Sequence, residues 1–134
     1  MSIENSSARK LDVFFYGLYM DPDVLASKAV TPSNPRHAIA YGYVLRLGAR
    51  ATMLRAAGQR VHGMVYSVTH ADLGALYLGL DAYCPEALLL HTEPQGSLAA
   101  LTMVLLAPPS PDESNSEYAA KLRASLVDLG FPAA

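Results

Sequence analysis

The first residues whose types and spacing suit chemistry lie at 11–25, LDVFFYGLYMDPDVL. The β-branched and aromatic run that ends at Tyr16 favours a strand, and Asp21 followed by Pro22 is typical of a helix start. Gly17 permits a sharp turn and the close approach of a ligand, so the N–H groups of residues 17–20 are predicted to face an anion or a polarised carbonyl. The alternative is that Gly17 only ends an edge strand whose aromatic residues fill the core.

Composition restricts the class of protein. The chain has 134 residues, of which 51% are hydrophobic and 16% charged, and a formal net charge of −2, which predicts one compact domain without a surface for nucleic acid. The single cysteine, Cys84, excludes an internal disulfide, and the four histidines lack ligand spacing, so no metal or other cofactor is expected. No apolar run is long enough for a membrane span, and the polar opening residues lack the apolar core of a signal peptide. We expect a cytoplasmic protein with a flexible arm at 1–10 and one domain at 11–134.

The strands that must position the loop follow in order. Residues 31–36 contain two prolines and predict an irregular connection, after which residues 37–47 alternate as a strand with a bulge position at Gly42. Residues 51–55 and 61–68 predict two further strands joined by a turn at Gly58. Both faces of 61–68 are apolar, which is typical of a central strand.

Helical signals come next. Thr69 with Asp72 forms a capping box, and apolar residues then recur at helical spacing, so a helix is predicted from His70 to about Ala82 with Pro85 closing it.

The last third of the chain predicts two strands and a helix. Residues 87–91 and 98–106 are the predicted strands, on either side of a turn at 94–97. Ser114 with Glu117 forms a second capping box before a final helix that Gly130 ends. Consecutive strands with few helices indicate an α+β class whose antiparallel or mixed sheet can close into a barrel.

The order of these motifs resembles the γ-glutamylcyclotransferase-like superfamily. The resemblance covers about Asp12 to Leu129 and rests on Tyr16-Gly17, Met20-x-Pro22-x-x-Leu25, Gly58-x-x-Val61-x-Gly63-x-Val65-Tyr66 and a helix running into Leu80-Asp81. It implies a small mixed β-barrel with flanking helices and a pocket at one mouth.

The resemblance also implies an activity. In active members a Tyr-Gly-Ser-Leu type loop binds the γ-glutamyl group and a glutamate serves as acid and base, while the free α-amine attacks the γ-carbonyl and closes 5-oxoproline. That reaction needs a base near the amine and N–H donors near the carbonyl oxygen. By this resemblance, the predicted substrate-binding loop is Tyr16, Gly17, Leu18, Tyr19 and Met20.

The sequence departs from the family at the base. The family's Leu-Asp-x-x-Glu-Gly signature reads LDAYCP at 80–85, so Cys84 stands at the glutamate position. Glu86, two positions on, is the candidate catalytic replacement; the alternative is that it is a solvated loop carboxylate. Asp81 is a further candidate base, or else a surface carboxylate at a helix end. Cys84 is a candidate nucleophile paired with His91, or else a small buried cysteine.

Aromatic and cationic side chains are the remaining candidates for the pocket. Tyr66 and Tyr83 are predicted to form walls beside Cys84, although tyrosines also complete cores with the hydroxyl at the surface. Arg46, Arg50 and Arg55 are candidates to hold a carboxylate, set against solvated positions.

Two hypotheses of function follow. The first is an enzyme that uses the loop at 16–20 and Glu86 to release 5-oxoproline. The second is a non-catalytic protein on the same fold that keeps a pocket for a small γ-glutamyl, amine or carboxylate ligand. The sequence leaves both open, together with the oligomeric state.

Overall fold

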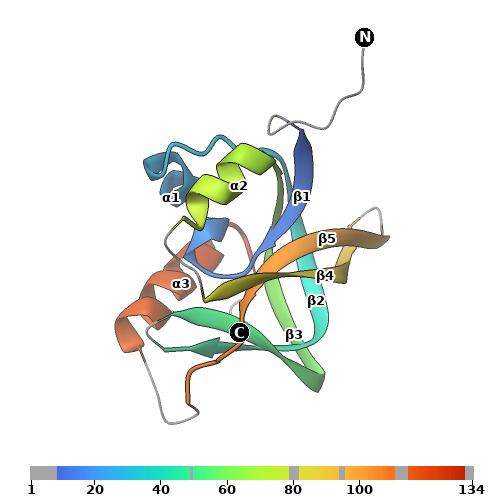
Figure 1. Cartoon of the computed structure of the whole chain (residues 1–134). Helices are drawn as coiled ribbons and strands as arrows, with labels where there is room; N and C mark the ends of the chain where they lie inside the picture. The colour runs from blue at the N-terminus through green and yellow to red at the C-terminus, as the bar shows by residue number, and fades with distance from the viewer. Residues whose placement is uncertain (1–8, 49, 79–81, 94–95, 111–114, 132–134) are drawn as a thin grey trace.

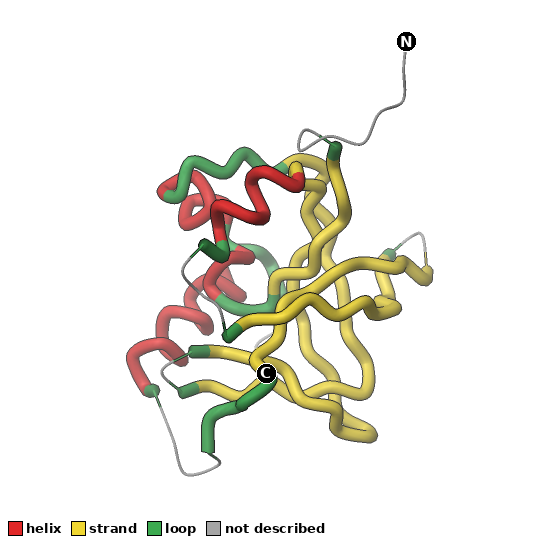
Figure 2. Tube along the Cα trace, in the orientation of Figure 1, coloured by secondary structure: helices red, strands yellow, loops and turns green. Residues whose placement is uncertain are grey.

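A closed five-stranded barrel with helices packed on one side forms the described part of the protein (Figure 1, Figure 2). The structure, a computed structural model, describes residues 9–48, 50–78, 82–93, 96–110 and 115–131. The strands follow one another around the barrel as β1-β3-β2-β4-β5, antiparallel except where β1 and β5 close it in parallel. The predicted α+β class and mixed barrel are confirmed.

Strand β1 (Lys10–Phe15) separates two apolar cores. Phe14 belongs to the cluster inside the barrel, to which all five strands contribute. Val13 and Phe15 belong to a second cluster, beneath the helices, which includes Leu25 and Leu122. Because successive side chains of a strand point to opposite faces, one strand supplies both cores.

Strands β2 (Ser33–Leu47) and β3 (Ala51–Thr69) form a long antiparallel pair that bends in the middle. Gly42 and Gly58 have φ values of +80° and +79°, and the pairing shifts between them. The predicted turn at Gly58 is therefore wrong, because a bulge with two left-handed glycines bends a continuous strand without ending it.

The predicted irregular connection belongs to a strand from Ser33 onward, and its irregularity is confirmed there. Strand β2 already begins there, and the pairing shifts between Ser33 and Arg36, where Asn34 has a φ of +52°. This irregularity accommodates Pro35, which cannot donate a ladder hydrogen bond.

Helix α2 (His70–Leu76) begins as predicted and ends early. The Thr69 side chain accepts from the Asp72 N–H at 3.0 Å, which confirms the cap. The chain is extended again at Tyr83, where β4 (Tyr83–Thr92) starts, so the predicted helix to Ala82 and the predicted strand start at residue 87 are wrong. Pro85 lies inside this strand because β4 pairs with β2 only at its far end, at His91, which leaves the strand's beginning as an edge.

The other elements end close to the predicted positions. Strand β5 spans Gly96–Leu105 and helix α1 spans Pro22–Ser27, with the Asp21 side chain accepting from the Asp23 N–H at 2.9 Å. Helix α3 (Ser116–Asp128) is capped by Asn115 and is followed by Gly130 with a φ of +83°. The predicted cap Ser114, like Asp81 and the turn at 94–95, lies outside the described residues. No helix in the described ranges is long and apolar enough to cross a bilayer.

Side chains complete the closure of the barrel. Among the described residues, β5 meets β1 in a single register pair, Val13 with Leu101. The Thr102 hydroxyl donates to the Phe14 carbonyl at 2.8 Å, and the Tyr16 hydroxyl donates to the Met103 carbonyl at 2.6 Å. Tyr16 is therefore held across the seam, which positions the loop that begins after it.

Candidate functional site

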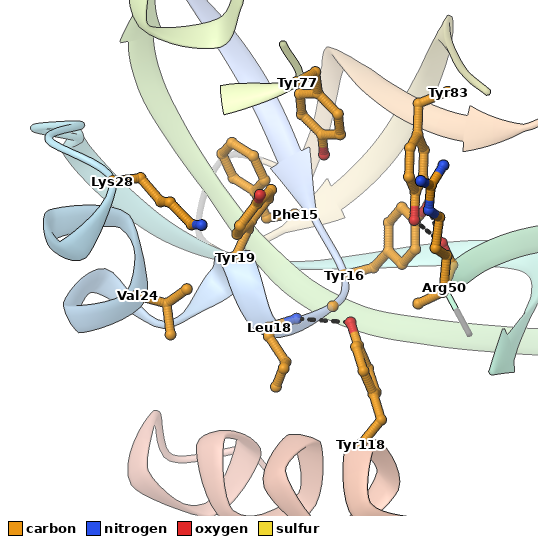
Figure 3. Close-up of a pocket in the computed structure, with 12 residues that line it drawn as sticks. Phe15, Tyr16, Leu18, Tyr19, Val24, Lys28, Arg50, Tyr77, Tyr83 and Tyr118 are labelled. Atoms are coloured by element: carbon orange, nitrogen blue, oxygen red, sulfur yellow. Dashed lines mark hydrogen bonds between the residues drawn. The ribbon is translucent and has the colours of Figure 1, made fainter. Parts of the chain in front are cut away.

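A cavity of about 280 Å³ opens beside the loop that follows β1 (Figure 3). Its walls come from that loop, α1, the start of β3, the two ends of the α2–β4 connection and α3. The lining residues are Phe15, Tyr16, Gly17, Leu18, Tyr19, Val24, Lys28, Arg50, Ala51, Tyr77, Tyr83 and Tyr118.

The loop folds into one short 3-10 turn, η1 (Leu18–Met20). The Met20 N–H donates to the Gly17 carbonyl at 3.1 Å, and the Leu18 N–H donates to the Tyr118 hydroxyl at 3.1 Å. Two of the four N–H groups predicted to face a ligand are therefore engaged within the protein. Figure 3 shows the second bond, with Tyr118 reaching from α3 toward the loop.

Gly17 is required by space and not by backbone conformation. Its φ of −108° is open to any residue. A Cβ at this position would lie 2.5 Å from the Tyr118 hydroxyl oxygen, well inside van der Waals contact. A side chain at residue 17 therefore requires the phenol of Tyr118 to move.

Five tyrosines give the cavity an aromatic wall with neutral hydroxyls. Burial raises the pKa of Tyr83 to about 12 and also raises the pKa values of Tyr16, Tyr19, Tyr77 and Tyr118. At neutral pH each hydroxyl therefore keeps its proton and stays uncharged.

Several of these hydroxyls hold the wall together. Tyr83 donates to the Ala51 carbonyl at 2.7 Å, and Tyr16 approaches the same carbonyl at 3.4 Å. Tyr19 donates to the Leu76 carbonyl at 3.4 Å. Edge-to-face contacts join Tyr77 to both Tyr19 and Tyr83, with ring centroids 5.8 and 5.4 Å apart. Hydrogen bonds to backbone carbonyls and ring contacts therefore link Tyr16, Tyr19, Tyr77 and Tyr83 into one wall.

The charges at the cavity are positive. Lys28 and Arg50 lie on opposite sides of it, and Arg50 lies beside Tyr83 (Figure 3). Among the described lining residues no side chain carries a carboxylate. Two cations with no carboxylate beside them among the described lining residues favour a ligand that bears a carboxylate.

The comparisons with known proteins agree with this fold. Residues 13–121 match the model of the gamma-glutamyl cyclotransferase, AIG2-like family. The chain belongs to this family.

Three solved structures illustrate the likeness. A protein named gamma-glutamyl cyclotransferase has a TM-score of 0.75 at 15% identity, covering 92% of this chain and 82% of its own. A protein from Arabidopsis thaliana has a TM-score of 0.68 at 20% identity, covering 95% and 97%. An AIG2-like protein from Mus musculus has a TM-score of 0.60 at 18% identity, covering 81% and 90%. These identities show a shared fold, and a search of curated proteins by sequence found no match.

In this member of the gamma-glutamyl cyclotransferase family, five of the predicted pocket residues line the cavity: Tyr16, Gly17, Leu18, Tyr19 and Tyr83. Met20 and Tyr66 lie instead in the core beneath the helices, where the Tyr66 hydroxyl donates to the Met20 carbonyl at 2.7 Å. Burial raises the pKa of Tyr66 to about 12. Tyr66 is therefore a core residue and not a wall of the cavity. Its hydroxyl is buried, whereas the alternative from the sequence placed that hydroxyl at the surface.

Cys84 and Glu86 are half-buried on β4 and do not line the cavity. By strand alternation, Glu86 shares its face of β4 with Leu88 and Leu90, which fill the barrel. The charge of Glu86 makes a minor contribution to the raised pKa of Tyr16, after burial and neighbouring tyrosines. Glu86 therefore lies near the barrel side of the cavity wall.

Cys84 and His91 do not form the predicted pair. They lie seven positions apart on an extended strand, which places them about 23 Å from each other, and His91 contacts the Glu93 carboxylate at 2.8 Å. Within the described ranges, no three His, Cys, Asp or Glu side chains gather where they could hold a metal ion.

The cavity also contains residues that the sequence interpretation missed. Of the three candidate arginines, Arg50 lines the cavity, whereas Arg46 donates to the Pro109 carbonyl at 3.1 Å and Arg55 is exposed on β3. Lys28 and Tyr118 were not predicted, because Lys28 is the C-cap residue of α1, Tyr118 lies in the first turn of α3, and each resembles an ordinary surface or core position. Their roles depend on where α1 and α3 pack.

Proposed function

We propose that this gamma-glutamyl cyclotransferase-like protein binds a small carboxylate-bearing ligand, such as a γ-glutamyl compound, in the tyrosine-lined cavity. The observation that carries the proposal is the composition of the lining: two cations, five tyrosines and, among the described residues, no carboxylate. Binding needs complementary charge and neutral donors, whereas catalysis of cyclisation also needs a base.

The cavity offers a different partner to each part of such a ligand. The Arg50 guanidinium can bind a carboxylate through two parallel N–H donors, and the Lys28 ammonium adds a second positive charge. Phe15, Leu18 and Val24 provide apolar contact for an aliphatic chain. The lining thus suits a short chain with a carboxylate at one end.

Release of 5-oxoproline is the second candidate function, and the position of Glu86 is the observation that favours it. In this reaction the ligand's α-amine nitrogen bonds to the carbon of its γ-carbonyl, the γ-amide C–N bond breaks, and a base carries the proton from the attacking nitrogen to the leaving one. Glu86 is half-buried and close enough to Tyr16 to affect its pKa. Because Glu86 does not line the cavity, the lining favours binding over catalysis.

Calorimetric titration with γ-glutamyl-alanine and with a γ-glutamyl amine tests binding. We expect measurable affinity, weakened about 10-fold in Arg50→Ala because one charge-assisted contact is lost. Arg55→Ala is the matched control, since Arg55 is exposed and outside the lining. Failure of the wild-type protein to bind either probe would overturn the proposal.

Chromatographic measurement of 5-oxoproline in the same mixtures tests the second candidate. Product that forms with the wild-type protein and disappears in Glu86→Gln would establish catalysis with Glu86 as the base. Product that persists in Glu86→Gln would establish an enzyme that uses another base. We expect no product above the protein-free rate.

A further inference from the structure

The Tyr118 hydroxyl lies where the sequence places a ligand oxygen. Its oxygen accepts the Leu18 N–H at 3.1 Å, and it fills the space that a Cβ of residue 17 would occupy. Tyr118 is 100 positions away from this loop in the chain. The Leu18 N–H, which the sequence predicts to face a ligand, therefore donates to the phenol of Tyr118.

Two bonds at the start of α3 hold Tyr118 in this place. The Asn115 side-chain oxygen accepts the Tyr118 N–H at 3.0 Å, and the Asn115 side-chain amide donates to the Gly48 carbonyl at 3.0 Å. The Tyr118 ring packs against both the barrel core and the core beneath the helices. A ring fixed on these sides keeps its hydroxyl at the cavity wall.

The hydroxyl proton of Tyr118 is available for a further hydrogen bond. A phenol has one proton to donate and oxygen lone pairs to accept, and here the Leu18 N–H uses the oxygen as an acceptor. Within the described ranges the hydroxyl proton has no acceptor. A hydroxyl that accepts one bond is polarised and becomes a better donor in the next one.

On the basis of the proposed function, we propose that Tyr118 is a specificity-determining residue that donates its hydroxyl proton to a carbonyl oxygen of the ligand. The chain of donors then runs from the Leu18 N–H to the Tyr118 oxygen, and from the Tyr118 hydroxyl to the ligand. A neutral donor suits a neutral carbonyl, while Arg50 and Lys28 suit the carboxylate. Among ligands that carry a carboxylate, Tyr118 thus selects those that also carry a carbonyl.

Two probes separate these roles. 5-Oxoproline carries a ring carboxylate and a lactam carbonyl, whereas cyclopentanecarboxylate keeps the ring and the carboxylate and lacks the carbonyl. Dissociation constants for both are measured with the wild-type protein, Tyr118→Phe and Tyr41→Phe. Tyr41→Phe is the matched control because Tyr41 is 55% exposed and outside this cavity. Circular dichroism and thermal unfolding establish that each variant is folded.

We expect Tyr118→Phe to weaken 5-oxoproline binding about 10-fold and to change cyclopentanecarboxylate binding less than twofold, with both unchanged in Tyr41→Phe. Equal weakening for the two probes would overturn the inference, because Tyr118 would then act only by supporting the loop. Unchanged or tighter 5-oxoproline binding would also overturn it, since the ligand would then need no Tyr118 donor or would displace it. A wild-type protein that binds the γ-glutamyl probes and neither of these two would overturn the inference alone, whereas one that binds none of the four would overturn the proposed function as well.

Discussion

Gly17→Ala and Tyr118→Phe are predicted to be strongly coupled. The new methyl group of Gly17→Ala would lie 2.5 Å from the Tyr118 hydroxyl oxygen. With that oxygen removed, the nearest atoms would be the ring Cζ of residue 118 at 3.7 Å and the Ala51 Cβ at 3.8 Å, which are ordinary contacts. Alanine should therefore be harmful beside tyrosine and tolerated beside phenylalanine.

The magnitude follows from three effects. Overpacking costs about 1–3 kcal/mol, and alanine in place of glycine returns about 0.4–1 kcal/mol by restricting the unfolded chain. Tyr118→Phe removes the 3.1 Å bond from the Leu18 N–H, which costs about 1 kcal/mol. Because the double variant loses the bond without the collision, we expect a favourable coupling of about 2 kcal/mol.

Urea unfolding of the wild-type protein, both single variants and the double variant measures this coupling. Gly74→Ala is the matched control, because a Cβ there would meet no atom within 4 Å and alanine is favoured in a helix. Gly74→Ala should combine additively with Tyr118→Phe. Additivity within about 0.5 kcal/mol for Gly17→Ala and Tyr118→Phe would refute the placement of the hydroxyl against Gly17.

Two further predictions concern the stability of the scaffold. The free energy of unfolding should fall as the pH rises from about 10 toward 12, because Tyr66 and Tyr83 keep their protons to about 12 when folded, whereas an unfolded tyrosine loses its proton near 10. Urea unfolding at pH 8–11 measures this slope, Tyr66→Phe should reduce it, and a flat wild-type profile would contradict the burial of these hydroxyls. Thr69→Ala should cost about 1 kcal/mol, because the Asp72 N–H loses its 3.0 Å acceptor. Thermal unfolding checks the loss, Thr69→Ser should restore most of it, and an alanine variant as stable as the wild type would show that the cap contributes nothing.

Local chemistry explains which elements could be predicted. The Thr69 cap and the Asp21-Pro22 helix start each satisfy backbone groups of the next turn, so a few neighbouring residues suffice to locate them. The β-branched and aromatic run of β1 is likewise local, and it located the strand before the loop correctly.

The incorrect predictions occurred where long-range pairing overrides a local signal. Gly58 indicates a turn by itself, but pairing with β2 keeps β3 continuous through a bulge. Pro85 indicates a helix end, but pairing with β5 keeps the chain extended there, so Glu86 lies on a strand and outside the cavity lining. Neither outcome can be predicted from spacing along the chain, because the partner strand decides it.

The sequence by itself determined the family, the barrel class and the stretch from Tyr16 to Tyr19 as one wall of the cavity. The tertiary structure decided what faces that wall. Lys28, Arg50 and Tyr118 come from three separate elements, and they meet the loop only because the barrel closes and α3 packs across it. The site is built around the N–H groups of this loop. One of them, the Leu18 N–H, donates to the phenol of Tyr118, 100 positions away in the chain. Spacing along the sequence does not predict this bond, because the packing of the elements decides which atom a donor meets.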